Sequence, residues 1–139
     1  MPVVDKKKAR FWSRMGPRAV YGQFLLEMAK SDPKVLALSA DLGRSSGLAA
    51  YSIELPSQYF NTGIAEQNLV GISAGLARMG YKPFATTFAP FASLRAGDQV
   101  RMNLGYMQEP VNLVALASGV ALGFLGNSHF GLEDIAIMR

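Results

Sequence analysis

Glu66 is the side chain of this sequence with the clearest potential for chemistry. It follows the turn residues Thr62 and Gly63 and stands in the first turn of a predicted helix, where the helix dipole favours a negative charge. A carboxylate in this place is either a residue that starts the helix or an acid presented to a ligand at a strand-to-helix corner. Its position alone leaves both interpretations open.

Two phenyl rings and one imidazole occupy two further loops. Phe88 and Phe91 flank Pro90, at the point where a predicted strand is followed by a helix. They are either core residues or, if one ring faces a ligand, a platform that stacks on a flat heterocycle. His129 lies in a glycine-rich loop, where an imidazole is either structural or suited to proton transfer and to hydrogen bonds with a polar substrate.

The elements that must position these residues follow from the hydrophobic pattern. Apolar residues at helical spacing predict helices, and short continuous apolar runs predict strands that are buried on both faces. The pattern predicts helices over residues 17–31, 65–79, 91–107 and 132–138, and strands over residues 35–39, 59–61, 83–87 and 111–117. This alternation indicates an α/β fold with a mainly parallel sheet flanked by helices.

Ligands of such sheets bind beyond the carboxyl ends of the strands. Glu66, both phenylalanines and the histidine all fall at that edge, in or beside four predicted loops: residues 41–47, 61–66, 87–91 and 118–131. We therefore expect one site at this edge, built from side chains that lie far apart in the sequence.

The composition excludes several kinds of chemistry. The chain has 139 residues, the size of one domain, and contains no cysteine and a single histidine. Disulfides, zinc–thiolate sites, cysteine nucleophiles and multi-histidine metal sites are therefore excluded, and we expect no metal-ligating residues. Any chemistry must use carboxylates, aromatic rings, one imidazole or a borrowed cofactor.

Positive charge is concentrated at the amino terminus. Residues 1–18 carry a net charge of +5, whereas the rest of the chain carries −1. We interpret residues 1–15 as a basic arm, either solvated or in contact with an acidic partner subunit, and residues 16–139 as the folded domain. The nearly neutral body argues against a nucleic-acid surface.

The longest uncharged stretch, residues 110–132, is interrupted by polar residues and glycines. A membrane span needs a more continuous apolar run, so we expect no contact with a membrane. The basic arm lacks the apolar core of a secretory signal, and we expect a cytoplasmic protein.

Four short motifs together resemble one known family. They are Gly-Ile-Ala-Glu-Gln-Asn (63–68), Thr-Phe-Ala-Pro-Phe (87–91), Asp-Gln-Val-Arg (98–101) and Ser-His followed by Leu-Glu-Asp (128–134). Each motif is weak alone, but four in register are specific. In their order and spacing the chain is similar to the pyrimidine-binding domain of the transketolase family. This resemblance implies the pyrimidine-type domain of the thiamine-diphosphate-binding fold.

The resemblance implies roles for the residues at the sheet edge. Glu66 matches the glutamate that hydrogen-bonds the aminopyrimidine of thiamine diphosphate and so helps the cofactor to form its carbanion. Phe88 and Phe91 match aromatic residues around the pyrimidine, and Asp41 matches an acidic residue near the cofactor at a subunit interface. His129 matches a histidine that faces the hydroxyl groups of the substrate.

The substrate half of the resemblance is less complete. Arg18 and Ser45 match positions that contact a sugar phosphate. A tyrosine expected near the pyrimidine is replaced by Leu94, a phosphate-contacting histidine by Ala117 and an acidic substrate contact by Leu125. The loss of polar contacts indicates a ketose that is less polar, or differently substituted, than an ordinary sugar phosphate.

Half of the expected active site has no counterpart in this sequence. The Gly-Asp-Gly…Asn signature of the domain that binds the diphosphate and Mg²⁺ is absent, and we expect the pyrimidine domain to end before its last strand and helix. The resemblance therefore implies the carboxyl-terminal subunit of a split transketolase, or a fragment of it. We expect it to be inactive alone and to join a diphosphate-binding subunit in a dimer of heterodimers.

An enzyme of this kind transfers a two-carbon ketol unit from a ketose to an aldose, with thiamine diphosphate and Mg²⁺ as cofactors. Two alternatives stay open at this point. One is another thiamine-diphosphate enzyme, such as a synthase similar to 1-deoxyxylulose-5-phosphate synthase. The other is a truncated domain without catalytic activity that serves in protein interactions.

Overall fold

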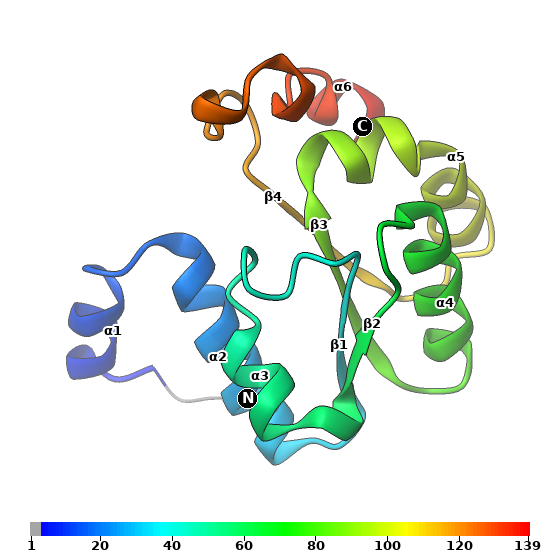
Figure 1. Ribbon diagram of the computed structural model, residues 1–139. Helices are drawn as coiled ribbons and strands as arrows, with labels where there is room; N and C mark the ends of the chain where they lie inside the picture. Colours follow the sequence, from blue (N-terminus) through cyan, green and yellow to red (C-terminus); the bar gives the residue numbers. More distant parts are fainter. Residues whose placement is uncertain (1–3) are drawn as a thin grey trace.

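The fold is built on one parallel sheet with helices on both faces (Figure 1). The computed structural model describes residues 4–139, and its four strands lie in the order β2-β1-β3-β4. The strands are β1 (Val35–Ser39), β2 (Tyr59–Asn61), β3 (Lys82–Phe88) and β4 (Asn112–Leu116).

The helices alternate with these strands. The α-helices are α1 (Lys6–Trp12), α2 (Pro17–Ser31), α3 (Ala49–Glu54), α4 (Glu66–Arg78), α5 (Gly97–Gln99) and α6 (Asp134–Met138). Wide helical turns of the π type cover Phe91–Arg95 and Val100–Tyr106. Short 3₁₀ turns cover Pro56–Gln58, Gly123–Leu125 and Asn127–His129.

A continuous apolar sequence explains the central place of β1. It pairs in parallel with β2 on one side and with β3 on the other, and all five of its residues are buried. Val35 and Ala37 belong to the core cluster with α2 and α3, whereas Leu36 and Leu38 belong to the cluster with α4. A strand covered on both faces needs apolar residues at nearly every position. The predicted α/β fold with a mainly parallel sheet is confirmed.

The segment after β3 differs from its sequence prediction. The pattern predicts one helix over residues 91–107, but two wide segments are separated at Ala96, whose φ of −107° and ψ of 10° leave the helical region. A wide turn rotates every later residue around the helix axis, so a regular helical period misplaces the residues beyond it.

The basic arm is partly helical and is held on α2. The Asp5 carboxylate caps α1 by accepting a hydrogen bond from the Lys8 backbone N–H at 2.7 Å. Lys8 Nζ lies 2.6 Å from Glu27 Oε2, and the Trp12 ring meets Phe24 edge to face. The described part of the arm is therefore packed against the domain rather than free in solvent. Its separation from the domain at residue 15 stays a prediction.

The uncharged stretch 110–132 forms β4 and the glycine-rich loop that follows it. The side chains of β4 are exposed or half-buried, in contrast to those of β1. Within residues 4–139, no helix has both the length and the hydropathy needed to cross a bilayer.

A pair of glycines sets how closely α2 packs on the loop after β1. A Cβ atom at Gly22 would lie 1.9 Å from the carbonyl oxygen of Gly47, and a Cβ atom at Gly47 would lie 2.2 Å from the carbonyl oxygen of Arg18. Gly47 also has a φ of +84°, a backbone conformation that residues with side chains rarely adopt. The two glycines thus fix the position of the 41–47 loop at the carboxyl edge of the sheet.

We predict that Gly22→Ala destabilises the protein by about 3 kcal/mol, because the added methyl group must push the 41–47 loop away from α2. Urea unfolding followed by circular dichroism measures the change. Gly71→Ala is the matched control: it lies on α4 with nothing within 4 Å of the added carbon, and alanine is the better helix former by about 1 kcal/mol. Equal stability of the two variants would refute the packing argument.

Candidate active site at the carboxyl edge of the sheet

One pocket brings together most of the residues that the sequence predicts for the site. It has a volume of about 330 Å³ and lies beyond the carboxyl ends of β1 and β3, at the start of α4. Its lining contains Ala40, Asp41, Leu42, Ile64, Glu66, Phe88, Phe91, Arg95 and His129. Side chains from four separate loops therefore meet where a parallel sheet is expected to bind its ligand.

Glu66 is the buried acid of this pocket. It is the first residue of α4 and is only 2% exposed. Arg95 Nη1 donates a hydrogen bond to Glu66 Oε2 at 2.8 Å. A carboxylate buried to this degree needs a charged or hydrogen-bonding partner, so its placement at the pocket wall depends on the groups that face it.

Arg95 is a residue of the pocket that the sequence prediction misses. Its guanidinium carbon lies 4.2 Å from the centroid of the Phe91 ring, within cation–π distance, while the same group pairs with Glu66. The spacing of four residues between Phe91 and Arg95 is a signal that both lie on one helix face. Nothing in the sequence, however, shows that this face meets the start of α4.

Three aromatic rings form the apolar side of the pocket. The centroids of Phe88 and Phe91 lie 6.2 Å apart, and the His129 ring lies 6.1 Å from the first and 5.3 Å from the second, edge to face with each. Phe88 is 6% exposed, and the other two rings are half-buried. The rings thus join the end of β3 to the glycine-rich loop 118–131.

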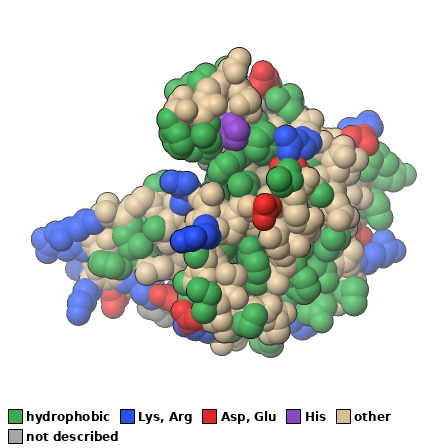
Figure 2. All heavy atoms as spheres, viewed as in Figure 1, with side chains coloured by type: hydrophobic (Ala, Val, Ile, Leu, Met, Phe, Trp, Pro, Cys, Tyr) green, Lys and Arg blue, Asp and Glu red, His purple; other side chains and the backbone are tan. Residues whose placement is uncertain are grey.

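His129 is oriented by its neighbour and stays accessible. Its Nδ1 lies 3.0 Å from Ser128 Oγ, and Nε2 has no hydrogen-bond partner among the described residues. Figure 2 shows the histidine on the surface, at the base of the lobe that loop 118–131 forms. One ring nitrogen therefore remains available to a polar group that enters the pocket.

Loop 118–131 is closed at its neck. Gly119 and Gly131 exchange two backbone hydrogen bonds of 2.9 Å, and Ser118 Oγ donates to the Asp134 carboxylate at 2.5 Å. The loop tip is apolar and projects into solvent, with Phe124 83% exposed. A closed neck fixes the base of the loop that carries His129.

The second acid of the pocket, Asp41, is held by Asn61. Asn61 Oδ1 accepts from the backbone N–H groups of Asp41 and Gly63, both at 3.0 Å, and Asn61 Nδ2 donates to Asp41 Oδ1 at 3.1 Å. Asp41 has a φ of +58°, a left-handed conformation that aspartate adopts more readily than most residues. One amide side chain thus ties the 41–47 loop to the turn before Glu66.

Comparison with known proteins identifies the domain. Residues 14–139 match the family model described as transketolase, pyrimidine binding domain. The chain belongs to the transketolase family. The described fold agrees: it superposes on a solved split-gene transketolase, described as an inactive beta4 tetramer, with a TM-score of 0.74 and 41% identity over 88% of this chain and 39% of that one.

Two curated relatives are transketolase subunits with different substrates in their names. One, a subunit of the apulose-4-phosphate transketolase of Phocaeicola vulgatus, is 42% identical over 88% of this chain and 39% of its own length. A 6-deoxy-6-sulfo-D-fructose transketolase subunit from a Clostridium species is 38% identical over 88% of this chain and 38% of its own length. This transketolase domain therefore spans less than two fifths of the length of these curated relatives.

The pocket suits the pyrimidine half of the transketolase cofactor, thiamine diphosphate. Phenyl faces match a flat heterocycle, and a buried carboxyl group can share a proton with a ring nitrogen or accept a hydrogen bond from an amino group. The lining holds two acids, Glu66 and Asp41, but only one arginine. This excess of negative charge does not suit a diphosphate, which needs cationic partners. Within residues 4–139, no group of three or more histidine, aspartate or glutamate side chains is placed to hold a metal ion.

Two residues that the sequence assigns to this transketolase site lie outside the pocket. Arg18 Nη1 donates to the backbone carbonyl of Ser45 at 2.9 Å, and both residues are exposed. They lie together at the start of α2 and in the 41–47 loop, but neither lines the pocket with Glu66. Their contact with a sugar phosphate stays a prediction.

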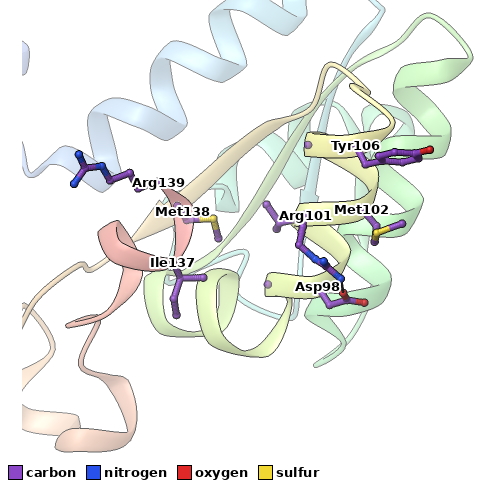
Figure 3. A pocket seen from close by; sticks show the side chains of 10 residues that line it. Asp98, Arg101, Met102, Tyr106, Ile137, Met138 and Arg139 are labelled. Carbon is purple, nitrogen blue, oxygen red and sulfur yellow. Dashed lines mark hydrogen bonds and ion pairs between the residues drawn. The ribbon is translucent and has the colours of Figure 1, made fainter.

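A larger hollow of about 770 Å³ lies away from this chemistry, between the second wide helical segment and the end of α6 (Figure 3). Met102, Tyr106, Ile137 and Met138 give it a mainly apolar lining. The charged pair in its wall, Arg101 and Asp98, is joined by a 2.8 Å ion pair. The larger hollow thus lacks a buried acid, and the smaller pocket is the candidate active site.

We predict that Asn61→Ala destabilises this domain by about 1 kcal/mol, because two backbone N–H groups and the Asp41 carboxylate lose their partner at an exposed site where water replaces part of the bonding. Urea unfolding measures the loss. Asn68→Ala serves as control, since Asn68 is exposed on α4 and makes no side-chain hydrogen bond to another described residue, and should change stability by less than about 0.5 kcal/mol. Equal losses would contradict the role of Asn61 as a clamp.

Proposed function

We propose that this chain is a subunit of a thiamine-diphosphate-dependent transketolase, which transfers a two-carbon ketol unit from a ketose to an aldose. The observation that carries the proposal is the buried Glu66 carboxylate, which lies beside two phenyl rings and an accessible histidine in one pocket. Split transketolase subunits among the relatives support the same reaction.

The chain's own residues bind and orient the pyrimidine half of the cofactor. Phe88 and Phe91 hold the flat ring and exclude water from one side of the pocket. The Glu66 carboxyl group shares a proton with a nitrogen of the pyrimidine ring through a hydrogen bond. Thiamine diphosphate, when bound, supplies the carbon nucleophile that a protein side chain cannot.

A partner domain completes the site in this proposal. It binds the diphosphate and Mg²⁺, for which the pocket described above has no suitable lining. The exposed face of α4 supports close contact between subunits, because an added Cβ at Gly71 or Gly75 would have no described atom from outside its own stretch of helix within 4 Å. We propose a cytoplasmic dimer of heterodimers in which this chain alone is inactive.

The substrate-binding half relies on His129, with Arg18 and Ser45 at its outer edge. The free Nε2 of His129 hydrogen-bonds a hydroxyl group of the ketose. Leu125 and the exposed Phe124 supply apolar surface at the tip of the same loop. This composition favours a ketose that is less polar, or differently substituted, than a common sugar phosphate. The names of the two curated relatives, one with a sulfo group and one with a 4-phosphate, support only a different substitution.

The role of Glu66 is tested by the exchange of the cofactor's C2 proton for deuterium in the enzyme assembled with its partner. We predict that Glu66→Gln slows this exchange by at least about a hundredfold, because an amide cannot exchange a proton with the ring nitrogen as a carboxyl group can. Glu54→Gln, which removes only a surface ion pair with Lys30, should exchange normally. Normal exchange in Glu66→Gln would refute the proposed mechanism.

The role of His129 is tested with a panel of ketose donors. We predict that His129→Ala lowers kcat/KM for the best ketose by about a hundredfold and lowers the affinity for thiamine diphosphate much less, because the imidazole meets the substrate and only packs against the rings that hold the pyrimidine. The panel should also rank less polar or substituted ketoses above xylulose 5-phosphate. A preference for xylulose 5-phosphate would overturn the proposed substrate class.

A further inference from the structure

Arg95 contacts both kinds of group that line the pyrimidine pocket. Its Nη1 lies 2.8 Å from the carboxylate of Glu66, and its guanidinium carbon lies 4.2 Å from the centroid of Phe91. The Glu66 side chain is 2% exposed, whereas the Arg95 side chain is 45% exposed. A half-exposed cation is thus paired with a fully buried acid.

The buried carboxylate depends on this arginine. In the described part of the chain, Arg95 is the one group that donates a hydrogen bond to the Glu66 carboxylate. Removing the partner of a buried acid is strongly destabilising, because it leaves an uncompensated charge where solvation is poor. The exposed side of Arg95, in contrast, allows its guanidinium to turn toward solvent at little cost.

We propose that Arg95 is a positioning residue of the pyrimidine pocket, an inference that rests on the proposed function. Before the cofactor binds, its guanidinium holds the Glu66 carboxylate at the pocket wall and pins the Phe91 ring beside it. When the pyrimidine reaches Glu66, the carboxyl group shares a proton with the ring nitrogen instead, so its negative charge no longer needs Arg95, which gives up the ion pair and keeps its stack on Phe91. Arg95 therefore presents both groups in the arrangement that the cofactor needs.

The chain offers a matched control. Arg101 lies on the following helical segment and makes an ion pair of the same length, 2.8 Å, with Asp98. Both of these side chains are at least 65% exposed, and they line the larger hollow of Figure 3 rather than the pyrimidine pocket. An exposed pair of this kind contributes little to stability.

The test measures binding of thiamine diphosphate with Mg²⁺ by calorimetry, in the chain assembled with its diphosphate-binding partner. We expect Arg95→Met to weaken binding about tenfold, because Glu66 and Phe91 lose their fixed positions. Arg95→Lys restores a donor to Glu66 and should recover most of the affinity, and Arg101→Met should bind normally. Unchanged affinity in Arg95→Met, or a lysine variant as weak as the methionine variant, would overturn the proposal.

Thermal melting of the same assemblies without cofactor separates this proposal from the proposed function. Arg95→Met should lower the melting temperature, and the double variant Glu66→Gln, Arg95→Met should regain most of it, because the unpaired charge is gone. Additive losses would contradict the role of Arg95. If the parent assembly does not bind thiamine diphosphate, the proposed function fails, while the melting cycle still decides whether Arg95 positions Glu66.

Discussion

A negative charge buried at the edge of a parallel sheet is the constraint on which the rest of this site depends. Glu66 is almost fully removed from solvent, and a buried carboxylate without a partner costs about 3 to 5 kcal/mol. Such a cost is a large part of the stability of a domain of this size. The pocket therefore exists in this form only because Arg95, from a different element, reaches the same point.

The sheet and two tight packing devices bring these elements together. The carboxyl ends of β1 and β3 lie side by side because the strands pair in parallel. The close approach of Gly22 to Gly47 sets the loop that carries Asp41, and Asn61 joins that loop to the turn before Glu66. The pocket is thus formed by backbone geometry first and by side-chain chemistry second.

The sequence predicts the parts of this arrangement that depend on local pattern. The apolar run of β1 and the helix that begins near Glu66 are both found, because burial on two faces and helical periodicity leave a direct record in residue type. Resemblance to transketolases brings Glu66, Phe88, Phe91 and Asp41 into one site, and the structure places them in one pocket. Arg95 could not be predicted, because its partner lies 29 residues away and Arg95 itself ends a wide helical turn.

In the proposed enzyme, this chain binds the pyrimidine half of thiamine diphosphate and a partner binds the rest. Calorimetry tests this division most directly, with thiamine diphosphate and Mg²⁺ titrated into the chain alone, into the diphosphate-binding subunit alone and into their equimolar mixture. We expect tight binding in the mixture only. Equally tight binding by one subunit alone, or no binding by a mixture in which the two subunits associate, would contradict it.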